Sequence, residues 1–353
     1  MKKKKVMMAM SGGVDSSVAA HLLLEKGYNV AGITMCIGFN AECNTDKTCC
    51  SLQDIEDAKK VCQVLGISHY ILDFSNEMNE MVIKPFIADY TTGRTPNPCI
   101  LCNEHLKFGL LLDKALAMGF DNIATGHYAR IIFENNKCFL EKPADKEKDQ
   151  TYFLYSIPHK KLSKILFPLG EYTKNEVRGI AEKINLPVSN KPDSQDICFF
   201  PDGGSSVFFQ NQGYEGIPGE IKHVNGKNLG IHKGIIFYTI GQRRGLGISY
   251  PEPLYVISIN AITNQIIVGE KKFLKSRGLT AICVNFYIEK KSDKAFAKIR
   301  YSHMHSECYY NFDGNTFNIL FNEPQEAITP GQSVVLYSGN RILGGGIITC
   351  IFD

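Results

Sequence analysis

Residues 6–17 read Val-Met-Met-Ala-Met-Ser-Gly-Gly-Val-Asp-Ser-Ser, an apolar run followed by a glycine pair among hydroxyl and carboxyl side chains. The apolar residues 6–10 predict a short buried strand, and the pattern from Val18 to Glu25 predicts a helix. Two adjacent glycines let the backbone turn tightly enough to aim successive N–H groups at an anion, and the new helix adds partial positive charge there. The stretch therefore predicts a phosphate-binding loop at the point where a strand becomes a helix.

This loop differs from the two commonest phosphate motifs. It lacks the Gly-Lys-Ser/Thr ending of a P-loop and the glycine spacing of a dinucleotide-binding loop, which argues against a γ-phosphate-transferring enzyme and against a dehydrogenase. A glycine-rich turn without a ligand is the alternative, but the serines and Asp15 beside the glycines favour phosphate binding. The run resembles the loop of the PP-loop ATP pyrophosphatases, enzymes that attach AMP to a substrate oxygen and release pyrophosphate.

Length and composition indicate a globular protein of two or three domains, because the chain has 353 residues and 44% hydrophobic content. Its 39 basic and 36 acidic residues nearly balance, so any RNA-binding site must be a local patch. The basic residues 1–5 precede only five apolar residues, too few for a signal peptide or a membrane span. The sequence predicts a cytoplasmic protein with no membrane contact. Its clustered cysteines are then reduced thiols that serve catalysis or metal binding.

Alternating strand and helix patterns in the first half predict a parallel sheet. The expected strands cover residues 6–10, 30–35, 69–74 and 122–124. Helix-end signals are explicit at Ser51 and Gly66, which bound one helix, and at Thr173 with Glu176, a capping box that starts another. Ligands of such sheets bind at the carboxyl ends of the strands, where residues 11–16, Met35 and Gly126 are expected.

After about Pro201 the pattern changes to short apolar runs broken by glycine and proline, which is typical of β structure. Runs of this kind cover residues 235–240, 254–259 and 333–337. The predicted fold class is α/β. A Rossmann-like PP-loop domain with a parallel sheet (1–204) is followed by a small, mostly β central domain (205–273) and a C-terminal β-barrel (274–353).

A second motif, Thr95-Pro96-Asn97-Pro98-Cys99-Ile100-Leu101-Cys102-Asn103, lies between two helical patterns. Its prolines predict an extended, rigid loop that presents both cysteines. Asn103 is expected to cap the next helix, and a thiol near a helix N-terminus has a lowered pKa. A third motif, residues 191–200, presents Cys198 on a polar loop. Two reactive thiols are therefore expected.

Metal binding is the alternative use of these cysteines. Cys99 and Cys102 form a CxxC, the commonest half of a zinc site, but no second CxxC follows in the chain. Together with Cys198 they could ligate three irons of a 4Fe–4S cluster and leave the fourth iron open to sulfide. A further group, Cys43, Cys49 and Cys50, either binds a metal or reflects chance in a cysteine-rich chain.

Over nearly its whole length the chain resembles the tRNA-uridine 2-sulfurtransferases, also called tRNA-specific 2-thiouridylases. The motifs that carry the resemblance are residues 9–17, 95–103 with 107–108, 124–128, 148–150, 193–195 with 197–199, 240–245 and 330–333. The resemblance implies that ATP, with Mg²⁺, adenylates the C2 oxygen of the wobble uridine 34 of a tRNA, releasing pyrophosphate. Sulfur then displaces AMP to give 2-thiouridine.

The same resemblance implies partners and residue roles. The tRNAs for Lys, Glu and Gln are the expected substrates, and a cysteine desulfurase or a sulfur-relay protein is the expected donor. Cys198 would carry sulfur as a persulfide and Cys102 would be the nucleophile that helps release it, a relay that is favoured over the cluster. Asp15 would help to place Mg²⁺. The central domain would act as a tRNA-binding adaptor.

The binding residues implied by the resemblance form two sets. The nucleotide set is Ala9, Met10, Ser11, Gly12, Gly13, Val14, Asp15, Ser16, Met35 and Gly126. The tRNA set is Asn97, Pro98, Cys99, His127, Lys148, Asp149, Gln150, Arg300, Tyr301 and Gln332. Cys99 stands where many relatives carry an aspartate beside the target base. Arg243 and Arg244 lie between glycines, where they can contact phosphates.

Other function classes remain open. A non-catalytic, ATP-sensing protein that binds RNA or metal would not release pyrophosphate and would need neither Cys102 nor Cys198. An adenylating amidotransferase would need a glutaminase domain or partner, and a tRNA lysidine synthetase needs no cysteine.

Overall fold

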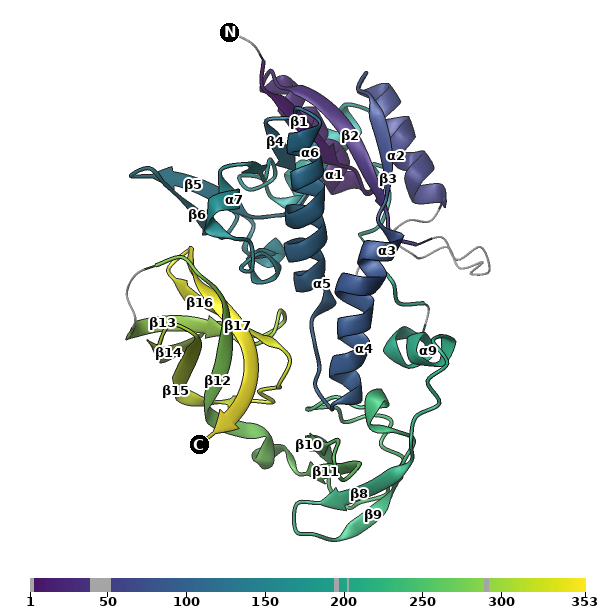
Figure 1. Ribbon diagram of the computed structural model, residues 1–353, viewed down its shortest axis with the longest axis vertical. Helices are drawn as coiled ribbons and strands as arrows, with labels where there is room; N and C mark the ends of the chain where they lie inside the picture. Colours follow the sequence, from purple (N-terminus) through teal and green to yellow (C-terminus); the bar gives the residue numbers. More distant parts are fainter. Residues whose placement is uncertain (1–2, 39–51, 194–196, 202, 289–291) are drawn as a thin grey trace. The chain divides into compact units, whose positions relative to one another are not determined.

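The computed structural model of the protein describes residues 3–38, 52–193, 197–201, 203–288 and 292–353. The chain divides into two compact units (Figure 1). The first unit contains residues 1–82, 99–202 and 340–342, and the second contains residues 83–98, 203–339 and 343–353. The three-domain division at residues 1–204, 205–273 and 274–353 stays a prediction. Among the described helices, none combines the length and the apolar character needed to cross a membrane.

The first unit contains the expected parallel sheet, in the strand order β3-β2-β1-β4-β7. The strands are β1 (Lys5–Ala9), β2 (Asn29–Cys36), β3 (His69–Asp73), β4 (Asn122–Ala124) and β7 (Ile165–Leu166). Every pairing in this sheet is parallel. The four predicted strands are confirmed, and the short β7 is an addition.

Helices cover both faces of this sheet, as the fold class requires. Val6 and Met8 of β1 pack with α1 (Val14–Glu25), α2 (Leu52–Val64) and α8 (Lys174–Lys183) in one core. Met7, which points to the other face because side chains alternate along a strand, is also fully buried. Besides the helical run that carries the cysteine motif, the unit contains α3 (Ser75–Met78), η1 (Asn79–Ile83), β5 (Arg130–Glu134), β6 (Lys137–Glu141), η3 (Lys146–Lys148), η4 (Thr151–Phe153) and α7 (His159–Leu162).

The helix-end signals in the sequence are largely confirmed. Thr173 caps α8, and both halves of the capping box with Glu176 are formed. Gly66 adopts φ 67° two residues after α2 ends, a conformation that glycine reaches without strain. Ser51 lies outside the described residues.

The predicted conformation of the cysteine motif was wrong. A continuous helical run starts at Pro98, as α5 (Pro98–Leu101), the π-helical segment η2 (Cys102–Leu111) and α6 (Leu112–Ala117). Proline fits the first position of a helix, because the missing N–H would have no partner there and its φ is already helical. Asn103 is therefore not a cap, and its buried Nδ2 donates to the carbonyl oxygen of Phe153 at 2.9 Å.

In the second unit, α4 (Lys84–Thr91) and α9 (Gly204–Asn211) accompany a four-stranded sheet in the order β10-β11-β8-β9. Its strands are β8 (Gly219–His223), β9 (Asn228–His232), β10 (Tyr255–Asn260) and β11 (Gln265–Gly269). The apolar run 235–240, predicted as a strand, instead contains the 3₁₀ turn η5 (Ile235–Phe237). Consecutive residues Ile235 and Ile236 are both buried, so the run fills a core rather than alternating between two faces.

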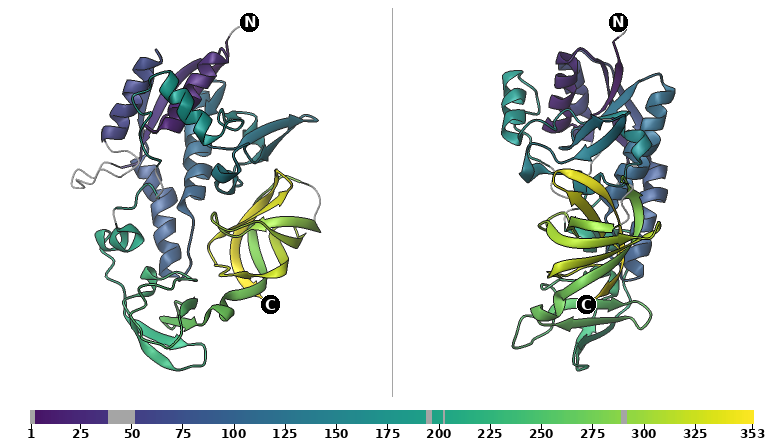
Figure 2. Two further views of the ribbon diagram at one scale, coloured as in Figure 1. Left: turned by 180° about the vertical axis from the view of Figure 1, so that it is seen from behind. Right: turned by 90° about the vertical axis from the view of Figure 1, so that its left-hand side faces the viewer.

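The C-terminal strands close into a barrel (Figure 2, green to yellow). After η6 (Lys271–Leu274) they are β12 (Lys275–Phe286), β13 (Ser292–Lys298), β14 (Ser306–Phe312), β15 (Thr316–Glu326), β16 (Ser333–Ser338) and β17 (Arg341–Phe352). Their order is β12-β15-β14-β13-β16-β17, and pairing of β12 with β17 closes the ring. The interior is apolar, with fully buried Tyr310, Phe317 and Val334, so the predicted barrel is confirmed.

Candidate active site

The loop after β1 leads into α1 as the sequence predicts. Gly13 is the N-cap of α1, with φ −99° and ψ 168°. Because glycine has no side chain, it cannot satisfy the first N–H groups of the helix, which remain suited to an anion. Ser16 and Ser17 donate from Oγ to the carbonyl oxygen of Gly13 at 3.2 and 2.7 Å, which fixes the turn. Ala9 is the last residue of β1, Met10 follows it, and Val14 is the first residue of α1.

Two glycines permit close backbone contacts around this loop. Gly12 adopts φ 71°, and a Cβ there would lie 2.3 Å from the carbonyl oxygen of Asp54 in α2. A Cβ on Gly126, two residues after β4, would lie 2.8 Å from the backbone nitrogen of Ser16. The structure therefore brings Gly126 to the first turn of α1. Met35 lies near the carboxyl end of the neighbouring strand β2.

Asp15, in the first turn of α1, is held by two donors. Its Oδ1 accepts a hydrogen bond from Lys174 Nζ at 2.7 Å and one from the Tyr128 hydroxyl at 2.9 Å. Burial and then the negative charge of Asp15 raise the pKa of Tyr128, so this hydroxyl stays protonated and donates. Tyr128 follows Gly126 and His127 in the chain, so the contact connects the turn after β4 to the phosphate loop.

Lys174 is a site residue that sequence reasoning missed. Its side chain is only 10% exposed, and it occupies the first position of α8, where the helix dipole disfavours a cation. Lys174 Nζ also contacts Asp193 Oδ1 at 2.7 Å, so two carboxylates compensate this placement. In the sequence, the one signal that could have identified Lys174 was its position as a cation at the N-terminus of a predicted helix, where the dipole is unfavourable for positive charge.

The carboxylate of Asp193 forms ion pairs with three cationic side chains. Besides Lys174, Lys148 Nζ contacts its Oδ2 and Arg178 NH2 its Oδ1, each at 3.0 Å. Partial burial alone would raise the pKa of Asp193, but the hydrogen bonds and charges of Lys174 and Lys148 outweigh it and hold the pKa below its ordinary value. We call Lys148, Lys174, Arg178 and Asp193 the Asp193 cluster.

Lys191 connects the same stretch of chain to the phosphate loop. Its Nζ donates to the carbonyl oxygen of Gly12 at 3.1 Å and to the carboxylates of Asp54 and Asp57 at 2.7 Å each. Partial burial would lower the pKa of Lys191, but the two carboxylates outweigh it and raise the pKa. Lys191 and Asp193 thus hold the chain a few residues before Cys198. None of these contacts was expected from the sequence.

The three candidate sulfur residues belong to the first unit. Cys102 is buried at the first position of η2, while Cys99 and Cys198 are half-buried. Within the described ranges, no three or more His, Cys, Asp or Glu side chains are grouped so that they could hold a metal ion. In this conformation Cys99, Cys102 and Cys198 are therefore not arranged as a ligand set. Cys43, Cys49 and Cys50 lie outside the described residues.

His127, also in the first unit, lies in an aromatic environment. Its Nδ1 is 2.7 Å from Thr125 Oγ1, and its ring centroid is 5.9 Å from that of Phe108 and 6.1 Å from that of Phe167. Burial, and then the charge of Lys107, place the pKa of His127 well below its ordinary value. The imidazole is therefore neutral at neutral pH, and it can exchange hydrogen bonds with an uncharged base edge without the cost of burying a charge.

Asp149 and Gln150 support the backbone around the site. Gln150 Oε1 accepts from the N–H of Tyr128 at 2.9 Å, and Asp149 Oδ1 accepts from the N–H of Thr151 at 3.0 Å. Asp149 is buried. Gln150 therefore fixes the turn that carries His127 and Tyr128, and Asp149 fixes the start of η4.

The other predicted tRNA residues belong to the second unit. Gln332 Nε2 donates to the carbonyl oxygen of Thr95 at 2.8 Å, which places the turn before β16 beside the chain that leads to Asn97 and Pro98. Arg300 NH2 donates to the carbonyl oxygens of Ile240 and Ala327 at 3.0 and 2.9 Å.

Exposed side chains of the second unit include a tyrosine and two arginines. Tyr301 is 39% exposed, and the buried Lys298 places Nζ 5.1 Å from its ring centroid. Arg243 and Arg244 are exposed between Gly241 and Gly245.

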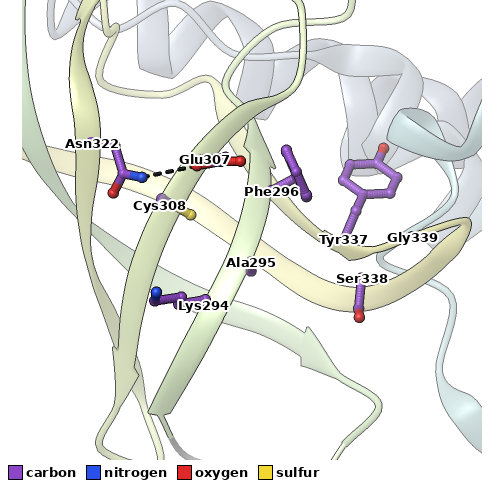
Figure 3. Close-up of a pocket in the computed structure, with 9 residues that line it drawn as sticks. All are labelled: Lys294, Ala295, Phe296, Glu307, Cys308, Asn322, Tyr337, Ser338 and Gly339. Atoms are coloured by element: carbon purple, nitrogen blue, oxygen red, sulfur yellow. Dashed lines mark hydrogen bonds between the residues drawn. The ribbon is translucent and has the colours of Figure 1, made fainter.

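The barrel has a pocket of about 250 Å³. Figure 3 shows Asn322 donating to Glu307 at its edge, with Phe296 and Cys308 nearby. Burial raises the pKa of the Cys308 thiol to about 12, so this cysteine is unreactive at neutral pH. None of the nucleotide-set or sulfur residues lines this pocket.

The chain matches three family models in succession. They are the tRNA methyl transferase HUP domain over residues 4–202, the tRNA methyl transferase PRC-barrel domain over 207–270 and the aminomethyltransferase beta-barrel domain over 276–348.

Curated relatives match nearly end to end. The tRNA-specific 2-thiouridylase MnmA 1 of Syntrophus aciditrophicus is 50% identical over 98% of this chain and 93% of its own length. MnmA 2 of a Thermoanaerobacter species is 47% identical over 98% of this chain and 97% of its own. MnmA of Acetivibrio thermocellus is 46% identical over 99% of this chain and 100% of its own.

Proposed function

Because the chain belongs to the family of tRNA-specific 2-thiouridylases, we propose that it uses ATP to replace the C2 oxygen of a tRNA uridine with sulfur. The observation that carries the proposal is the phosphate loop, whose glycine N-cap leaves the first N–H groups of α1 to an anion. A simple ATP sensor is disfavoured, since the relatives that match over the full length are named as thiouridylases.

In the first step the C2 oxygen of the uridine attacks the α-phosphorus of ATP, and pyrophosphate leaves. Oxygen at C2 is a poor leaving group, whereas AMP is a good one, so activation must precede sulfur transfer. Donors fixed in advance around the loop stabilise the charge that develops on the departing pyrophosphate. The wobble uridine 34 of the tRNAs for Lys, Glu and Gln is the proposed target, because bases of a single-stranded loop can be turned outward without opening a duplex.

Mg²⁺ would neutralise phosphate charge when it is bound. Asp15 by itself makes a poor magnesium site here, since its Oδ1 already accepts from a lysine and a tyrosine. Mg²⁺ usually keeps several waters and binds through one or two carboxylates together with substrate phosphates. We therefore expect the ion to enter with ATP.

In the second step Cys198 carries sulfur as a persulfide. The terminal sulfur attacks C2 of the adenylated uridine and AMP leaves, which joins the base to Cys198 through a disulfide. The Cys102 thiolate then attacks Cys198 Sγ, releasing 2-thiouridine and leaving a disulfide between the two cysteines, which a cellular thiol reduces. Splitting one displacement into two follows the logic of covalent catalysis.

The cluster alternative has less support, because Cys99, Cys102 and Cys198 are described residues and are not grouped as ligands. Protein prepared without oxygen distinguishes the two. The relay predicts full activity with no bound iron, whereas activity that rises in proportion to iron content would establish the cluster.

The proposal is tested by reconstitution in solution. The purified chain is mixed with ATP, unmodified tRNA, and a cysteine desulfurase with cysteine as the proposed sulfur source, and the digested nucleosides are analysed by mass spectrometry. We expect 2-thiouridine, AMP and pyrophosphate in equal amounts. Pyrophosphate release with no thiolated base in any tRNA would contradict the proposal. We place the reaction in the cytoplasm, where ATP and tRNA are available.

A further inference from the structure

The Asp193 cluster has the composition of an anion-binding site. Two ammonium groups and a guanidinium converge on the two oxygens of one carboxylate, at 2.7 to 3.0 Å. Lysine and arginine groups are the side chains that proteins use to hold phosphate oxygens, and charge-assisted contacts of this length are strong. Lys174 also contacts Asp15, so three positive charges meet two carboxylates and one positive charge is left in excess, which a more highly charged anion would compensate better.

The cluster is joined directly to the phosphate loop. The ammonium of Lys174 contacts Asp193 Oδ1 and Asp15 Oδ1 at 2.7 Å each, so one nitrogen lies between the cluster and the first turn of α1. The first N–H groups of α1 are the expected place of the β- and γ-phosphates. The cluster and the loop can therefore act on the same polyphosphate.

Lys174 and Arg178 reach Asp193 from one helix. They are positions i and i+4 of α8, which lie on the same face, and Lys148 approaches from the end of η3. The N–H of Lys174 and the N–H of Lys148 both donate to Asp145, through Oδ2 and Oδ1, at 2.8 and 3.3 Å. The three cations are thus held by the fold as well as by Asp193.

We propose that Lys148, Lys174 and Arg178 bind the pyrophosphate part of ATP, and that the carboxylate of Asp193 competes with it for them. The inference rests on the proposed function, whose activation step it extends. Its consequence concerns product release: after adenylation, Asp193 replaces pyrophosphate on the three cations and hastens its departure. A backbone phosphate of tRNA has the same chemistry, and the experiment separates the two sources.

The test is calorimetric titration of the full-length protein with inorganic pyrophosphate and Mg²⁺. Asp193→Asn removes the competing charge and keeps the shape, so pyrophosphate should bind about fivefold more tightly, as expected for the loss of partly exposed ion pairs. Lys174→Met should weaken binding about tenfold. The matched control is Asp113→Asn on α6, which breaks the ion pair with Lys161 of α7 and should change affinity less than about twofold.

Unchanged or weaker pyrophosphate binding in Asp193→Asn would overturn the inference. A gain in affinity cannot arise from misfolding, so this arm decides the matter even where Lys174→Met fails to fold. Titration with tRNA in the absence of nucleotide is the second arm. If Asp193→Asn tightens tRNA binding alone, the cations serve the RNA backbone, and the inference is wrong.

The same titrations separate this inference from the proposed function. If the unsubstituted protein binds no pyrophosphate and makes no 2-thiouridine, the proposed function fails. If it binds pyrophosphate and thiolates tRNA but Asp193→Asn shows no gain, only the role of Asp193 fails.

Discussion

Gln332 donates from Nε2 to the carbonyl oxygen of Thr95 at 2.8 Å, although 237 positions separate them in the chain. Thr95 precedes by three residues the proline that begins the helix of Cys99 and Cys102. Next to Gln332, Gly331 adopts φ 91°, and a Cβ there would lie 2.9 Å from the N–H nitrogen of Thr95. Within the second unit, the turn before β16 therefore holds the chain that leads into the cysteine-bearing helix.

Replacing Gln332 tests this support. In Gln332→Ala the carbonyl of Thr95 loses a hydrogen bond, which costs about 1 kcal/mol of stability, and we expect thiolation per tRNA to fall about tenfold through misplacement of the following helix. The free energy of unfolding in urea and the rate of 2-thiouridine formation measure the two effects. The exposed Gln210→Ala is the control. Equal activity of both variants would show that the contact has no functional role.

Gly126→Ala tests the close approach of the turn after β4 to α1. A Cβ 2.8 Å from the nitrogen of Ser16 must push the first turn of α1 aside, so we expect pyrophosphate release with tRNA to fall more than about tenfold and stability to fall by about 1–3 kcal/mol. Gly179→Ala in α8 is matched, because nothing lies within 4 Å of its Cβ position. That control should gain up to about 1 kcal/mol, since alanine favours helix. A fully active Gly126→Ala would place the nucleotide elsewhere.

Substitution of the two proposed sulfur residues separates their roles. Cys102→Ser and Cys198→Ser should both abolish 2-thiouridine while pyrophosphate release with tRNA continues. Mass spectrometry after loading with sulfur should find the persulfide in Cys102→Ser and not in Cys198→Ser, because only the latter lacks the carrier. Cys350→Ser, an exposed cysteine on β17, serves as the control and should behave as the unsubstituted protein does. Thiolation that survives in either serine variant rules out the relay.

His127 makes the free energy of unfolding depend on pH. The pKa of His127 in the folded protein lies well below the ordinary value of 6.5. Between these two pKa values, His127 is protonated in the unfolded chain and neutral in the folded protein. The stability it contributes is complete above the unfolded-state pKa and is lost as the pH falls toward the folded-state pKa, at up to about 1.4 kcal/mol per pH unit.

His127→Gln removes this titration. Between about pH 7.5 and pH 5 the variant should lose less stability in urea unfolding than the unsubstituted protein does. His69, His232 and His303 also have lowered pKa values, so the difference between the two curves is the relevant quantity. Parallel curves would mean that His127 is protonated equally in both states.

The salt dependence of tRNA binding tests the exposed arginines of the second unit. Each phosphate contact releases a counterion, so Arg243→Gln and Arg244→Gln should each lower the slope of log affinity against log salt by about 1. Lys183→Gln, an exposed cation at the end of α8, should leave the slope unchanged. A slope that neither arginine variant alters would place the phosphate contacts on other residues.

The sequence predicted those features that are encoded in neighbouring residues. The apolar run before Ser-Gly-Gly predicted β1 and the loop, and Thr173 with Glu176 predicted the start of α8 to the residue. Family resemblance added the roles of Cys102, Cys198 and the tRNA set, which stay predictions. Three local interpretations failed. Pro98 begins a helix instead of extending a loop, Asn103 therefore lies inside the helical run instead of capping it, and the run at 235–240 contains a 3₁₀ turn. Proline and consecutive apolar residues each fit more than one local structure.

Only the tertiary structure decided which distant polar groups come into contact. Asp15 and Lys174 are 159 positions apart, and Gly12 and Lys191 are 179 apart, yet each pair is in hydrogen-bond contact. Helices and strands can be predicted from short-range periodicity and capping residues. The hydrogen bonds that form them join residues that are close in the chain or in a repeating register. An isolated lysine or aspartate has no such pattern, so its partner is fixed only when packing of the apolar core brings distant segments together.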